Sequence, residues 1–341
     1  MNSPSGIPLV TIAIPTVNAG PMLENCLKAL DRQRFRDFDV VIIDNGESSL
    51  RADLFPVSFP VRVITPGCNV GFGAAINLAI ASGTARYVAS LNDDTVPDPD
   101  WLGALVREME RDPSVGMCAS RIQSVGSGRL DSAGMLICWD GSSKQRGQNR
   151  PVEDFSVSGE TLFPSACAAL YRRLMLDEIG LFDEDYFLYC EDTDLGLRAV
   201  WGGWKCRYVA EATVCHHYSQ TAGAVSPLKA RFVERNRLWV GIKNFPAGAL
   251  PMMPFVALAR YWWQLRAVRN RHGAAGEFIR SGNSLVDAAF ILIGAHWETL
   301  CVLPQLLRKR AAIRRTRKTS PSEFMSLLRR HSIGARDLAR L

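Results

Sequence analysis

The sequence predicts an α/β fold, in which one doubly wound, mostly parallel sheet carries helices on both faces and a helical region follows at the C-terminal end. Short uncharged apolar runs, rich in β-branched residues, alternate with segments whose apolar residues recur at helical spacing. Such alternation is typical of strand–helix–strand units joined by right-handed crossovers. The chain has 341 residues, of which 47% are hydrophobic, so it is long enough for one large domain or two smaller ones.

The first third of the chain supplies the expected strands. Each is a short apolar run followed by turn-forming residues, and the four runs are 9–14, 39–46, 61–65 and 87–94. The helices expected between and after them cover 22–30, 71–83 and 100–112. Ligands of parallel sheets bind at the carboxyl ends of the strands. Asp44 and the group Asn92-Asp93-Asp94 fall at such ends, which makes them candidate site residues.

The rest of the chain is less regular and then becomes helical. Between about 120 and 165 the pattern weakens as Gly and Ser become more frequent, which predicts an irregular excursion over the sheet. Helical patterns follow at 170–180, 192–205 and 306–318. Helical segments beyond Pro246 also carry Trp262, Trp263 and Trp297.

Charge is unevenly distributed along the chain. The formal net charge is +6, but residues 251–341 hold 16 Lys and Arg against 5 Asp and Glu, so the remainder carries an excess of acidic residues. Such asymmetry predicts an anionic partner for the basic tail, either nucleic acid or a lipid surface. Because the body is acidic and the tail contains Trp and Leu, the pattern favours a lipid surface and argues against nucleic acid. A helical cap packed on the body of the protein, or a dimer interface, is the alternative for the tail.

The cysteines and the N-terminal stretch bear on the compartment. Nine Cys are scattered without a C-x-x-C pair, which is typical of free thiols in a reducing compartment. Cys215-His216-His217 has no second Cys pair at zinc-finger spacing, which argues against structural zinc. The stretch MNSPSGIPLV lacks the basic and apolar parts of a signal peptide, and no uncharged apolar run of about 18 residues predicts a simple transmembrane helix.

Two polar stretches lie where a strand ends or a helix begins. LNDDT (91–95) carries an amide and two carboxylates, which predicts either a turn or a site for Mg²⁺ or Mn²⁺, cations that take oxygen ligands. NVGFGAAIN (69–77) combines glycines with a helix N-terminus, which predicts either a tight turn or a contact with phosphate. Its spacing departs from G-x-G-x-x-G, so a nicotinamide-binding fold is disfavoured.

Six carboxylates lie within residues 183–194, with no Lys or Arg among them. Aromatic residues expected to be buried interrupt them, which predicts a pocket wall rather than an open acidic surface. Asp192 and Asp194 start a helical stretch, where the helix dipole keeps carboxylates ionised, so an Asp at this position is a competent general base. His216 and His217 follow another apolar run and are either core residues or an additional cation ligand.

Seven motifs occur in one order along the chain, and together they resemble a known enzyme family. They are VTIAIPTVN, VVIIDNG, NVGFGAAIN, LNDDT followed by PDWL, GLFDEDYFLYCEDTDLGLR, CHHYS and ERNRLWVGIKNFP. In this order they resemble the inverting family 2 glycosyltransferases of the GT-A fold. The set is most similar to the bacterial rhamnosyltransferase-type members that build surface polysaccharides. The match covers about residues 8–246.

The resemblance implies a division of the chain. Residues 1–246 would form the GT-A catalytic domain, with a nucleotide-sugar-binding part at about 8–118 and an acceptor-binding and catalytic part at about 119–246. Residues 247–341 would form a basic, Trp-containing helical C-terminal region. A homo-oligomer stays open, and the expected location is cytoplasmic, peripheral at the inner face of the bacterial plasma membrane.

The resemblance also implies a role for each matching residue. Asp192 corresponds to the catalytic base, and Glu191 to its partner. Asp94 corresponds to the main metal ligand and His216 to the histidine that completes the metal shell, although the neighbouring His217 leaves that choice open. The residues implied to bind the nucleotide-sugar are Pro15, Thr16, Asn18, Asp44, Asn69, Gly71, Gly73, Asn92 and Asp93. The amide at position 92 replaces the first acid of the family's D-x-D motif and supplies less charge.

The implied activity is transfer of a sugar, with rhamnose as one candidate, from a nucleotide-diphospho-sugar to a hydroxyl of a glycan or lipid-linked acceptor, with Mg²⁺ or Mn²⁺ as cofactor. The cation, and transiently the oxocarbenium-like sugar, would be the positive partners of the acidic run 183–194. Two other functions stay open. A sugar nucleotidyltransferase would need a basic, Gly-rich loop for a triphosphate, which PTVNAGPMLENC lacks. The other is a non-catalytic relative that binds nucleotide-sugars or glycans.

Overall fold

The computed structural model describes residues 6–18, 20–46, 50–217, 226–269 and 273–340. By its internal contacts the chain divides into two compact units. The first, which we name the sheet unit, consists of Met1–Met135, Gln145–Phe187 and Gly203–Tyr218. The second, the helical unit, consists of Leu136–Lys144, Leu188–Gly202 and Ser219–Leu341.

This division does not follow the expected boundary at residue 246. The helices Glu191–Trp201 (α5) and Pro227–Asn244 (α6) precede that residue, but both pack against Leu285–Thr316 (α9), which follows it. A boundary drawn along the sequence cannot separate segments that contact each other in this way. The two compact units are defined by contacts, whereas the limits expected at residue 246 concern a division by function. Those limits stay a prediction.

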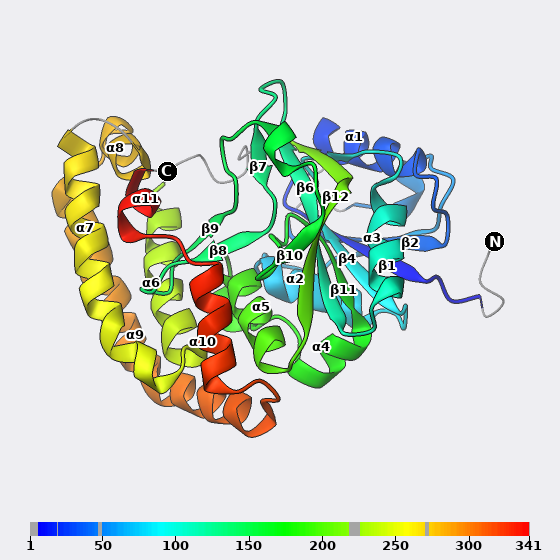
Figure 1. Ribbon diagram of the computed structural model, residues 1–341. Helices are drawn as coiled ribbons and strands as arrows, with labels where there is room; N and C mark the ends of the chain where they lie inside the picture. The colour runs from blue at the N-terminus through cyan, green and yellow to red at the C-terminus, as the bar shows by residue number, and fades with distance from the viewer. Residues whose placement is uncertain (1–5, 19, 47–49, 218–225, 270–272, 341) are drawn as a thin grey trace. The chain divides into compact units, whose positions relative to one another are not determined.

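Within the described residues, a ten-stranded sheet forms the centre of the sheet unit (Figure 1). Its strands are β1 Val10–Thr16, β2 Phe38–Asp44, β3 Val61–Ile64, β4 Tyr87–Leu91, β5 Thr95–Pro97, β6 Val115–Ser124, β7 Leu130–Ser132, β10 Gly159–Thr161, β11 Ala168–Arg172 and β12 Lys205–His216. Their order is β10-β12-β6-β11-β4-β1-β2-β3, while β5 pairs with β12 and β7 pairs with β6. The short strands β8 Met135–Ile137 and β9 Ser143–Gln145 pair with each other.

Most strands of this sheet run in one direction, which confirms the predicted mostly parallel sheet. β1 is parallel to β2 and β4, and β2 is parallel to β3. β11 is antiparallel to both β4 and β6, so β6 runs the same way as β4, and β12 is parallel to β6. The carboxyl ends of β1, β2, β4 and β12 therefore lie at one edge of the sheet. This edge receives Asp44, Asn92-Asp93-Asp94 and His216.

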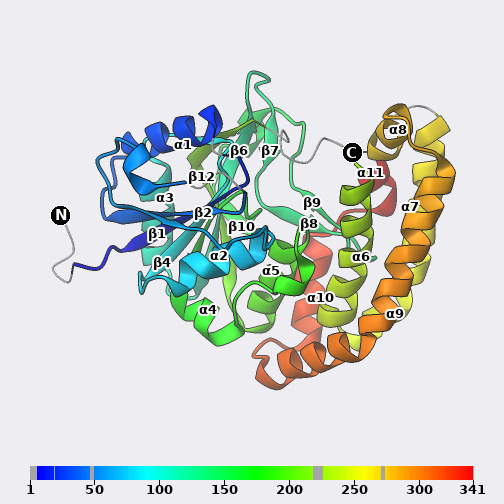
Figure 2. The same ribbon diagram turned by 180° about the vertical axis from the view of Figure 1, so that it is seen from behind.

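Helices cover both faces of the sheet, because its strands are apolar on both sides (Figures 1 and 2). One core joins α1 and α3 to Val10, Ile12 and Ile14, alternate residues of β1 that point to the same face. α2 packs against β1 and β2 from the other side. The helical segments of the sheet unit are α1 Pro21–Asp31, η1 Ala52–Leu54, α2 Phe72–Ala81, α3 Trp101–Arg111, η2 Val152–Phe155, α4 Arg173–Ile179 and η3 Glu184–Tyr186.

Two expected elements differ from the structure. Residues 170–180, expected as one helix, begin within β11 and form α4 only from Arg173. Every residue of β11 is buried, and periodicity does not distinguish a strand from a helix in a short, fully buried run. The excursion expected at 120–165 contains the end of β6 and the short strands β7 to β10.

The helical unit confirms the helical region predicted at the C-terminal end. Besides α5, α6 and α9, it contains η4 Ala247–Met252, α7 Met253–Arg269, α8 Gly273–Arg280, α10 Pro321–Arg330 and α11 Ala335–Arg340. α6 packs along α9, and α7 packs against α8 and α11 (Figure 2). Trp201 of α5 stacks on Phe324 of α10, with ring centroids 3.9 Å apart.

A buried ionic cluster joins α5 to α6. Asp194 is fully buried, and its carboxylate accepts hydrogen bonds at 2.8 Å from Arg198 Nε, Lys243 Nζ and Asn244 Nδ2. Burial alone would raise the pKa of Asp194, but the charges of Lys243 and Arg198 outweigh it and hold that pKa well below its ordinary value. Loss of this carboxylate would leave two buried cations without their partner.

We expect Asp194→Asn to lower the free energy of unfolding by about 3–5 kcal/mol, the usual cost of leaving a buried charge unpaired. Chemical denaturation measures this loss, and Asp337→Asn, at an exposed position of the same unit, is the matched control.

The contribution of Asp194 to stability should depend on pH. Because the pKa of Asp194 is lowered in the folded state, its contribution is present above the unfolded pKa of about 4 and is lost as the pH falls below that value. An equal difference between wild type and variant at about pH 3 and at about pH 7 would contradict this explanation.

Candidate active site

The carboxyl edge of the sheet brings Asp94 and His216 together. Nε2 of His216 lies 3.3 Å from Oδ1 of Asp94. Both side chains are buried, and within the described part of the chain no hydrogen bond reaches Oδ1 of Asp94. A buried carboxylate oxygen normally has a partner, so this oxygen and the imidazole nitrogen together fit a shared positive ligand.

Asp131, a buried residue of β7, orients the imidazole of His216 from its other side. Nδ1 of His216 lies 2.8 Å from Oδ2 of Asp131. A carboxylate at this nitrogen fixes the ring and leaves Nε2 to face a cation. Burial opposes protonation of His216, but the neighbouring Cys167 sulfur and the two carboxylates outweigh it and raise the pKa of His216. A cation bound at Nε2 would have to displace this proton, because imidazole binds a metal in its neutral form. The sequence did not indicate Asp131, because it follows a Gly- and Ser-rich stretch without periodicity.

Asp94 and His216 fit a divalent cation as a pair of protein ligands. Mg²⁺ is held through one or two carboxylates while phosphate and water fill the remaining positions, and imidazole suits transition metals. Across the residues that the structure describes, no group of three or more His, Cys, Asp or Glu side chains is arranged to hold a metal ion. A cation at Asp94 would therefore need oxygens from a bound diphosphate. The structure places His216 beside Asp94, whereas the side chain of His217 is exposed.

The ends of β1 and β4 are joined by a hydrogen bond. Thr16, the last residue of β1, donates its hydroxyl to Oδ2 of Asp93 at 2.5 Å. Burial raises the pKa of Asp93 to about 6, an effect that the Thr16 hydroxyl opposes and the charge of Asp94 reinforces. The remaining predicted residues of these ends are Pro15 and Asn92, which are half-buried, and Asn18, which is exposed.

Asp44 and Asn45 connect the end of β2 to neighbouring loops. Asp44 is buried, and its carboxylate accepts the backbone N–H of Gly46 at 3.2 Å and of Leu50 at 3.0 Å. Asn45 is also buried and donates its side-chain amide to the carbonyl of Gly71 at 3.2 Å. This contact ties the loop after β2 to the glycine-rich loop, and the sequence did not single it out. Contact of Asp44 with the nucleotide-sugar stays a prediction.

Gly71 is required by the backbone itself. Its φ is +86°, and a Cβ at this position would lie 2.3 Å from the carbonyl oxygen of Phe187. The exposed Asn69 accepts the N–H of Gly71 at 2.9 Å, and Gly73 is buried in the first turn of α2. Packing thus explains Gly71 as part of a tight turn, and contact of this loop with phosphate stays a prediction.

Asp192 and Glu191 open α5, in the helical unit. Asp192 is half-buried, and its Oδ1 accepts the N–H of Thr193 at 2.6 Å and lies 3.1 Å from Oγ1 of Thr193. Glu191 is buried, and no hydrogen bond from a described residue reaches its Oε2. Burial, and then the charge of Asp192, raise the pKa of Glu191 to about 8. Glu191 therefore holds its proton more tightly than an ordinary Glu side chain does.

The six carboxylates of 183–194 do not share one positive partner. Arg198 and Lys243 neutralise Asp194, so the expected cation is corrected for this residue, and its lowered pKa makes it a poor proton acceptor. Glu184 is exposed and accepts the side-chain amide of Asn77 at 2.9 Å. The residues of this run therefore differ in their partners and in their exposure, and the role of Asp192 as the base stays a prediction.

A family model and two relatives with assigned activities match this chain. The model of glycosyl transferase family 2 matches residues 11–180. The chain is 30% identical over 241 residues to the N-acetylglucosaminyl-diphospho-decaprenol L-rhamnosyltransferase of Mycobacterium tuberculosis, which covers 64% of this chain and 78% of that protein. It is 26% identical over 218 residues to the O-antigen chain rhamnosyltransferase RfbN of Salmonella typhimurium, with 62% and 67% covered.

Solved structures share the fold at low sequence identity. GalNAc-T7 with UDP, GalNAc and Mn²⁺ superposes with a TM-score of 0.52 at 14% identity, over 68% of this chain and 49% of that chain. The mannosyltransferase PcManGT from Pyrobaculum calidifontis, in complex with GDP-Man and Mn²⁺, gives 0.50 at 17% identity, over 90% and 85%. These likenesses concern the fold alone. Together with the family model and the rhamnosyltransferase relatives, they show that this chain belongs to glycosyl transferase family 2.

Proposed function

We propose that this glycosyltransferase is inverting and metal-dependent, and transfers a sugar from a nucleotide-diphospho-sugar to a hydroxyl of a glycan or lipid-linked acceptor in surface polysaccharide synthesis. The observation that carries the proposal is the buried pair of Asp94 and His216 at the carboxyl edge of the sheet, with Asp131 behind the imidazole. Two relatives are rhamnosyltransferases by name, which makes rhamnose the first sugar to test.

Asp192 acts as the general base in the proposed reaction. Its carboxylate takes the proton of the acceptor hydroxyl while the hydroxyl oxygen attacks the anomeric carbon and the bond from that carbon to the diphosphate breaks. Attack from the face opposite the leaving group inverts the anomeric configuration in one displacement. Glu191 is the proposed partner of Asp192, and burial raises its pKa to about 8, so it holds its proton more tightly than an ordinary Glu side chain does.

Asp94 and His216 would hold Mg²⁺ or Mn²⁺. When bound, the cation neutralises charge on the leaving diphosphate. Asp131 keeps Nε2 of His216 directed at Asp94, and Thr16 holds the carboxylate of Asp93. The proposed nucleotide-sugar contacts come from Pro15, Thr16, Asn18, Asp44, Asn69, Gly71, Gly73, Asn92 and Asp93.

Release of the nucleoside diphosphate distinguishes this function from the two alternatives. A panel of nucleotide-sugars is incubated with the protein and Mg²⁺ or Mn²⁺, with and without a chelator. A glycosyltransferase releases nucleoside diphosphate in the presence of the cation, slowly to water and faster with an acceptor. A non-catalytic relative would bind the donor without releasing it. A nucleotidyltransferase would instead release pyrophosphate from a nucleoside triphosphate and a sugar phosphate.

We expect Asp192→Asn to lower kcat by roughly 10²–10⁴, the usual contribution of a general base. Asn has nearly the same shape but cannot accept a proton, so donor binding should be retained. Asp185→Asn, at an exposed position of the same acidic run, is the control and should keep wild-type turnover. Transfer at the wild-type rate by Asp192→Asn would show that another group is the base.

We expect Asp94→Ala and His216→Ala to abolish the cation-dependent part of nucleoside diphosphate binding, because each removes one of the two proposed ligands. Calorimetric titration with and without Mn²⁺ measures this. His217→Ala is a matched control, since its side chain is exposed and it neighbours His216. Equal stimulation by Mn²⁺ in all four proteins would refute the site.

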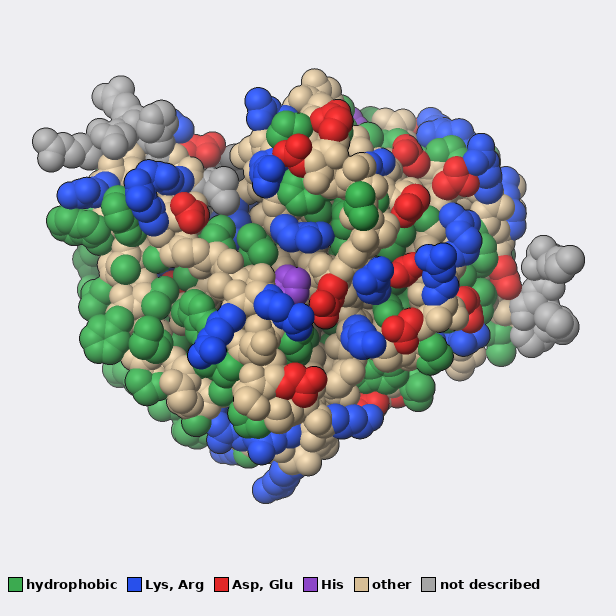
Figure 3. Space-filling view, viewed as in Figure 1, with side chains coloured by type: hydrophobic (Ala, Val, Ile, Leu, Met, Phe, Trp, Pro, Cys, Tyr) green, Lys and Arg blue, Asp and Glu red, His purple; other side chains and the backbone are tan. Residues whose placement is uncertain are grey.

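The proposed membrane contact is the apolar face of α7 and α9. The exposed side chains of α7 recur at helical spacing at Phe255, Leu258, Trp262 and Leu265, and those of α9 at Val286, Phe290, Ile293, Trp297 and Leu300. Figure 3 shows hydrophobic side chains gathered over α7. Exposed apolar surfaces of this extent mark protein or membrane contacts. Trp is also favoured at the headgroup region of a bilayer.

Charge around α9 favours an anionic bilayer as the partner. Exposed cations follow the apolar stretch of α9 at Arg308, Arg314, Arg315, Arg317 and Lys318, and each adds roughly 1 kcal/mol near an anionic leaflet. Arg310, in the same basic stretch, is buried and donates to the carbonyl of Ile242 at 2.6 Å. The acidic residues of α9 are occupied elsewhere, since Asp287 caps the helix with Ser284 and Glu298 pairs with Arg231.

We propose that α9 lies on the membrane rather than across it. Among the described residues, α9 is the one helix whose length and composition would allow it to cross a membrane, and little of its apolar window is buried. The sequence did not indicate such a helix, because Asp287 and Glu298 interrupt the apolar stretch. The packing of α9 along α6, with Glu298 paired to Arg231 at 2.7 Å and to Arg235 at 3.5 Å, supports an in-plane position.

The full-length protein is expected to co-sediment with anionic liposomes at low salt and to be released by high salt. Truncation at residue 250 would remove the helix against which α6 packs, so point variants are the sharper test. Trp262→Ser with Trp297→Ser should weaken binding, whereas Leu54→Ser with Val157→Ser, exposed apolar positions of the sheet unit, should not. Protein that stays in the supernatant at low salt would rule the membrane contact out.

A further inference from the structure

The segment that leads into Asp192 has an unusual backbone. Tyr189 and Cys190, the two residues before α5, both have a φ of +68°, in the left-handed region that residues with a side chain rarely adopt. Cys190 is the N-cap of α5, and its side chain makes no capping hydrogen bond. Such conformations persist only where the surrounding structure holds them.

Asn236 of α6 holds this strained turn. Its side chain is fully buried, and Nδ2 donates to the carbonyl oxygens of Leu188 at 2.8 Å and Tyr189 at 2.7 Å. Oδ1 of Asn236 accepts Nε of Arg235 at 2.8 Å, which keeps the amide nitrogen directed at the turn. Both carbonyls belong to the residues just before the N-cap of α5, so this contact acts where the direction of α5 is set.

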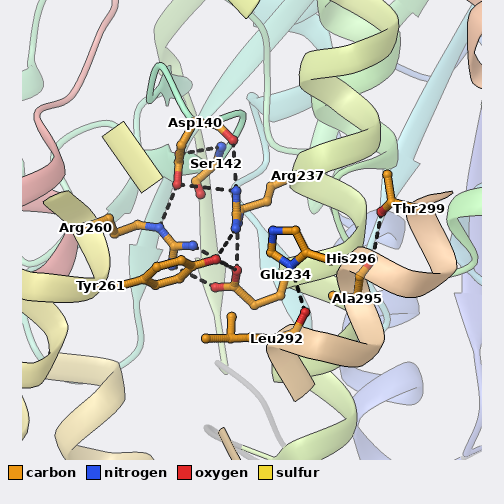
Figure 4. A network of polar contacts seen from close by, with 10 residues as sticks. All are labelled: Asp140, Ser142, Glu234, Arg237, Arg260, Tyr261, Leu292, Ala295, His296 and Thr299. Atoms are coloured by element: carbon orange, nitrogen blue, oxygen red, sulfur yellow. Dashed lines mark hydrogen bonds and ion pairs between the residues drawn. The ribbon is translucent and has the colours of Figure 1, made fainter. Parts of the chain in front are cut away.

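Arg237, the next residue of α6, fixes residues 136–144 to this helix (Figure 4). Its Nη1 donates to the carbonyl of Asp140 at 3.2 Å, and Nε of Arg260 donates to Oδ2 of Asp140 at 2.6 Å. Glu234 accepts Nε of Arg237 at 2.7 Å and both terminal nitrogens of Arg260, at 2.7 and 2.8 Å. Two cations and two carboxylates thus balance in a buried network that fixes residues 136–144 to α6.

Residues 136–144 carry Ser143, which reaches α5. Oγ of Ser143 lies 2.7 Å from Oγ1 of Thr193, and that oxygen lies 3.1 Å from Oδ1 of Asp192. The N–H of Thr193 donates to the same carboxylate oxygen at 2.6 Å. One oxygen of Asp192 is therefore held by contacts that lead back to α6.

We propose that Asn236 is a positioning residue for Asp192, because it clamps the strained turn from which α5 starts and so sets the direction of the Asp192 carboxylate. This inference rests on the proposed role of Asp192 as general base. It also assigns a function to the sequence ERNRLW (234–239), in which adjacent residues Asn236 and Arg237 hold the two segments that reach Asp192. A residue that acts through Asp192 should affect turnover and leave donor affinity unchanged.

The test compares Asn236→Asp and Asn236→Ala with the wild type. Asn236→Asp removes both donated hydrogen bonds but keeps the size of the side chain and its contact with Arg235, whereas Asn236→Ala adds no charge. We expect kcat to fall roughly 10- to 100-fold in both, as for a misplaced catalytic group, with the KM for the donor and the affinity for nucleoside diphosphate within about twofold of wild type. Hydrogen–deuterium exchange should be faster in residues 188–194 of both variants.

Asn283→Ala is the matched control, because Asn283 also donates its Nδ2 to a backbone carbonyl of the helical unit, that of Phe278. It should change neither kcat nor exchange in residues 188–194. Unchanged exchange in both Asn236 variants, or faster exchange with wild-type kcat, would overturn the inference. The two proposals can also fail separately. If the wild type transfers sugar from no donor while residues 188–194 still exchange hydrogen faster in the Asn236 variants, the proposed function is wrong, but Asn236 does hold the turn before α5.

Discussion

The common direction of β1, β2, β4, β6 and β12 is the constraint on which the sheet unit's candidate site depends. β11 enters between β4 and β6 in the opposite direction, so the strands on either side of it end at the same edge. Asp94 and His216 come within 3.3 Å because β5, which follows Asp94, pairs antiparallel with β12 and sets Thr95 opposite His216. Asp131 reaches His216 from β7, a short strand that pairs with β6. The candidate cation site therefore follows from strand order and direction.

The acidic residues at the start of α5 show how surroundings decide ionisation. Asp194 is buried with two cations, which hold its pKa low, whereas burial and the charge of Asp192 raise the pKa of Glu191. Asp192, between them, is partly exposed. Two carboxyl groups with widely separated pKa values are a recurring basis for assigning catalytic roles. Asp194 is occupied by its two cations, and Asp192 is the proposed base.

The sequence predicted those parts of the site that depend on local pattern. Buried strands are short apolar runs, so the polar residues that end them, Asp94 and His216, were visible as candidates. The contacts of Asp131 and Asn236 were not visible, because each depends on a partner distant in the sequence. The strand β11 was mispredicted as part of a helix for another reason. In a fully buried run of five residues, the pattern of apolar residues does not distinguish a strand from a helix.

In the helical unit, α6 and α9 contribute both to the surroundings of Asp192 and to an exposed apolar surface. α6 is buried against α9 and holds the turn before Asp192, while the other side of α9 exposes large apolar residues. The ion pairs of Glu298 with Arg231 and Arg235 hold this carboxylate on the α6 side of α9. A membrane contact through the exposed side would therefore leave the contacts around Asp192 intact.

The stereochemistry of the product tests a single displacement assisted by Asp192 most directly. A donor of known anomeric configuration is transferred to an acceptor, and the one-bond coupling between C1 and its hydrogen in the NMR spectrum reports the configuration of the new linkage. A single displacement gives only the inverted configuration, because the acceptor oxygen attacks opposite the diphosphate. Retention of configuration would contradict the proposed role of Asp192, since it requires a second displacement or attack from the same face.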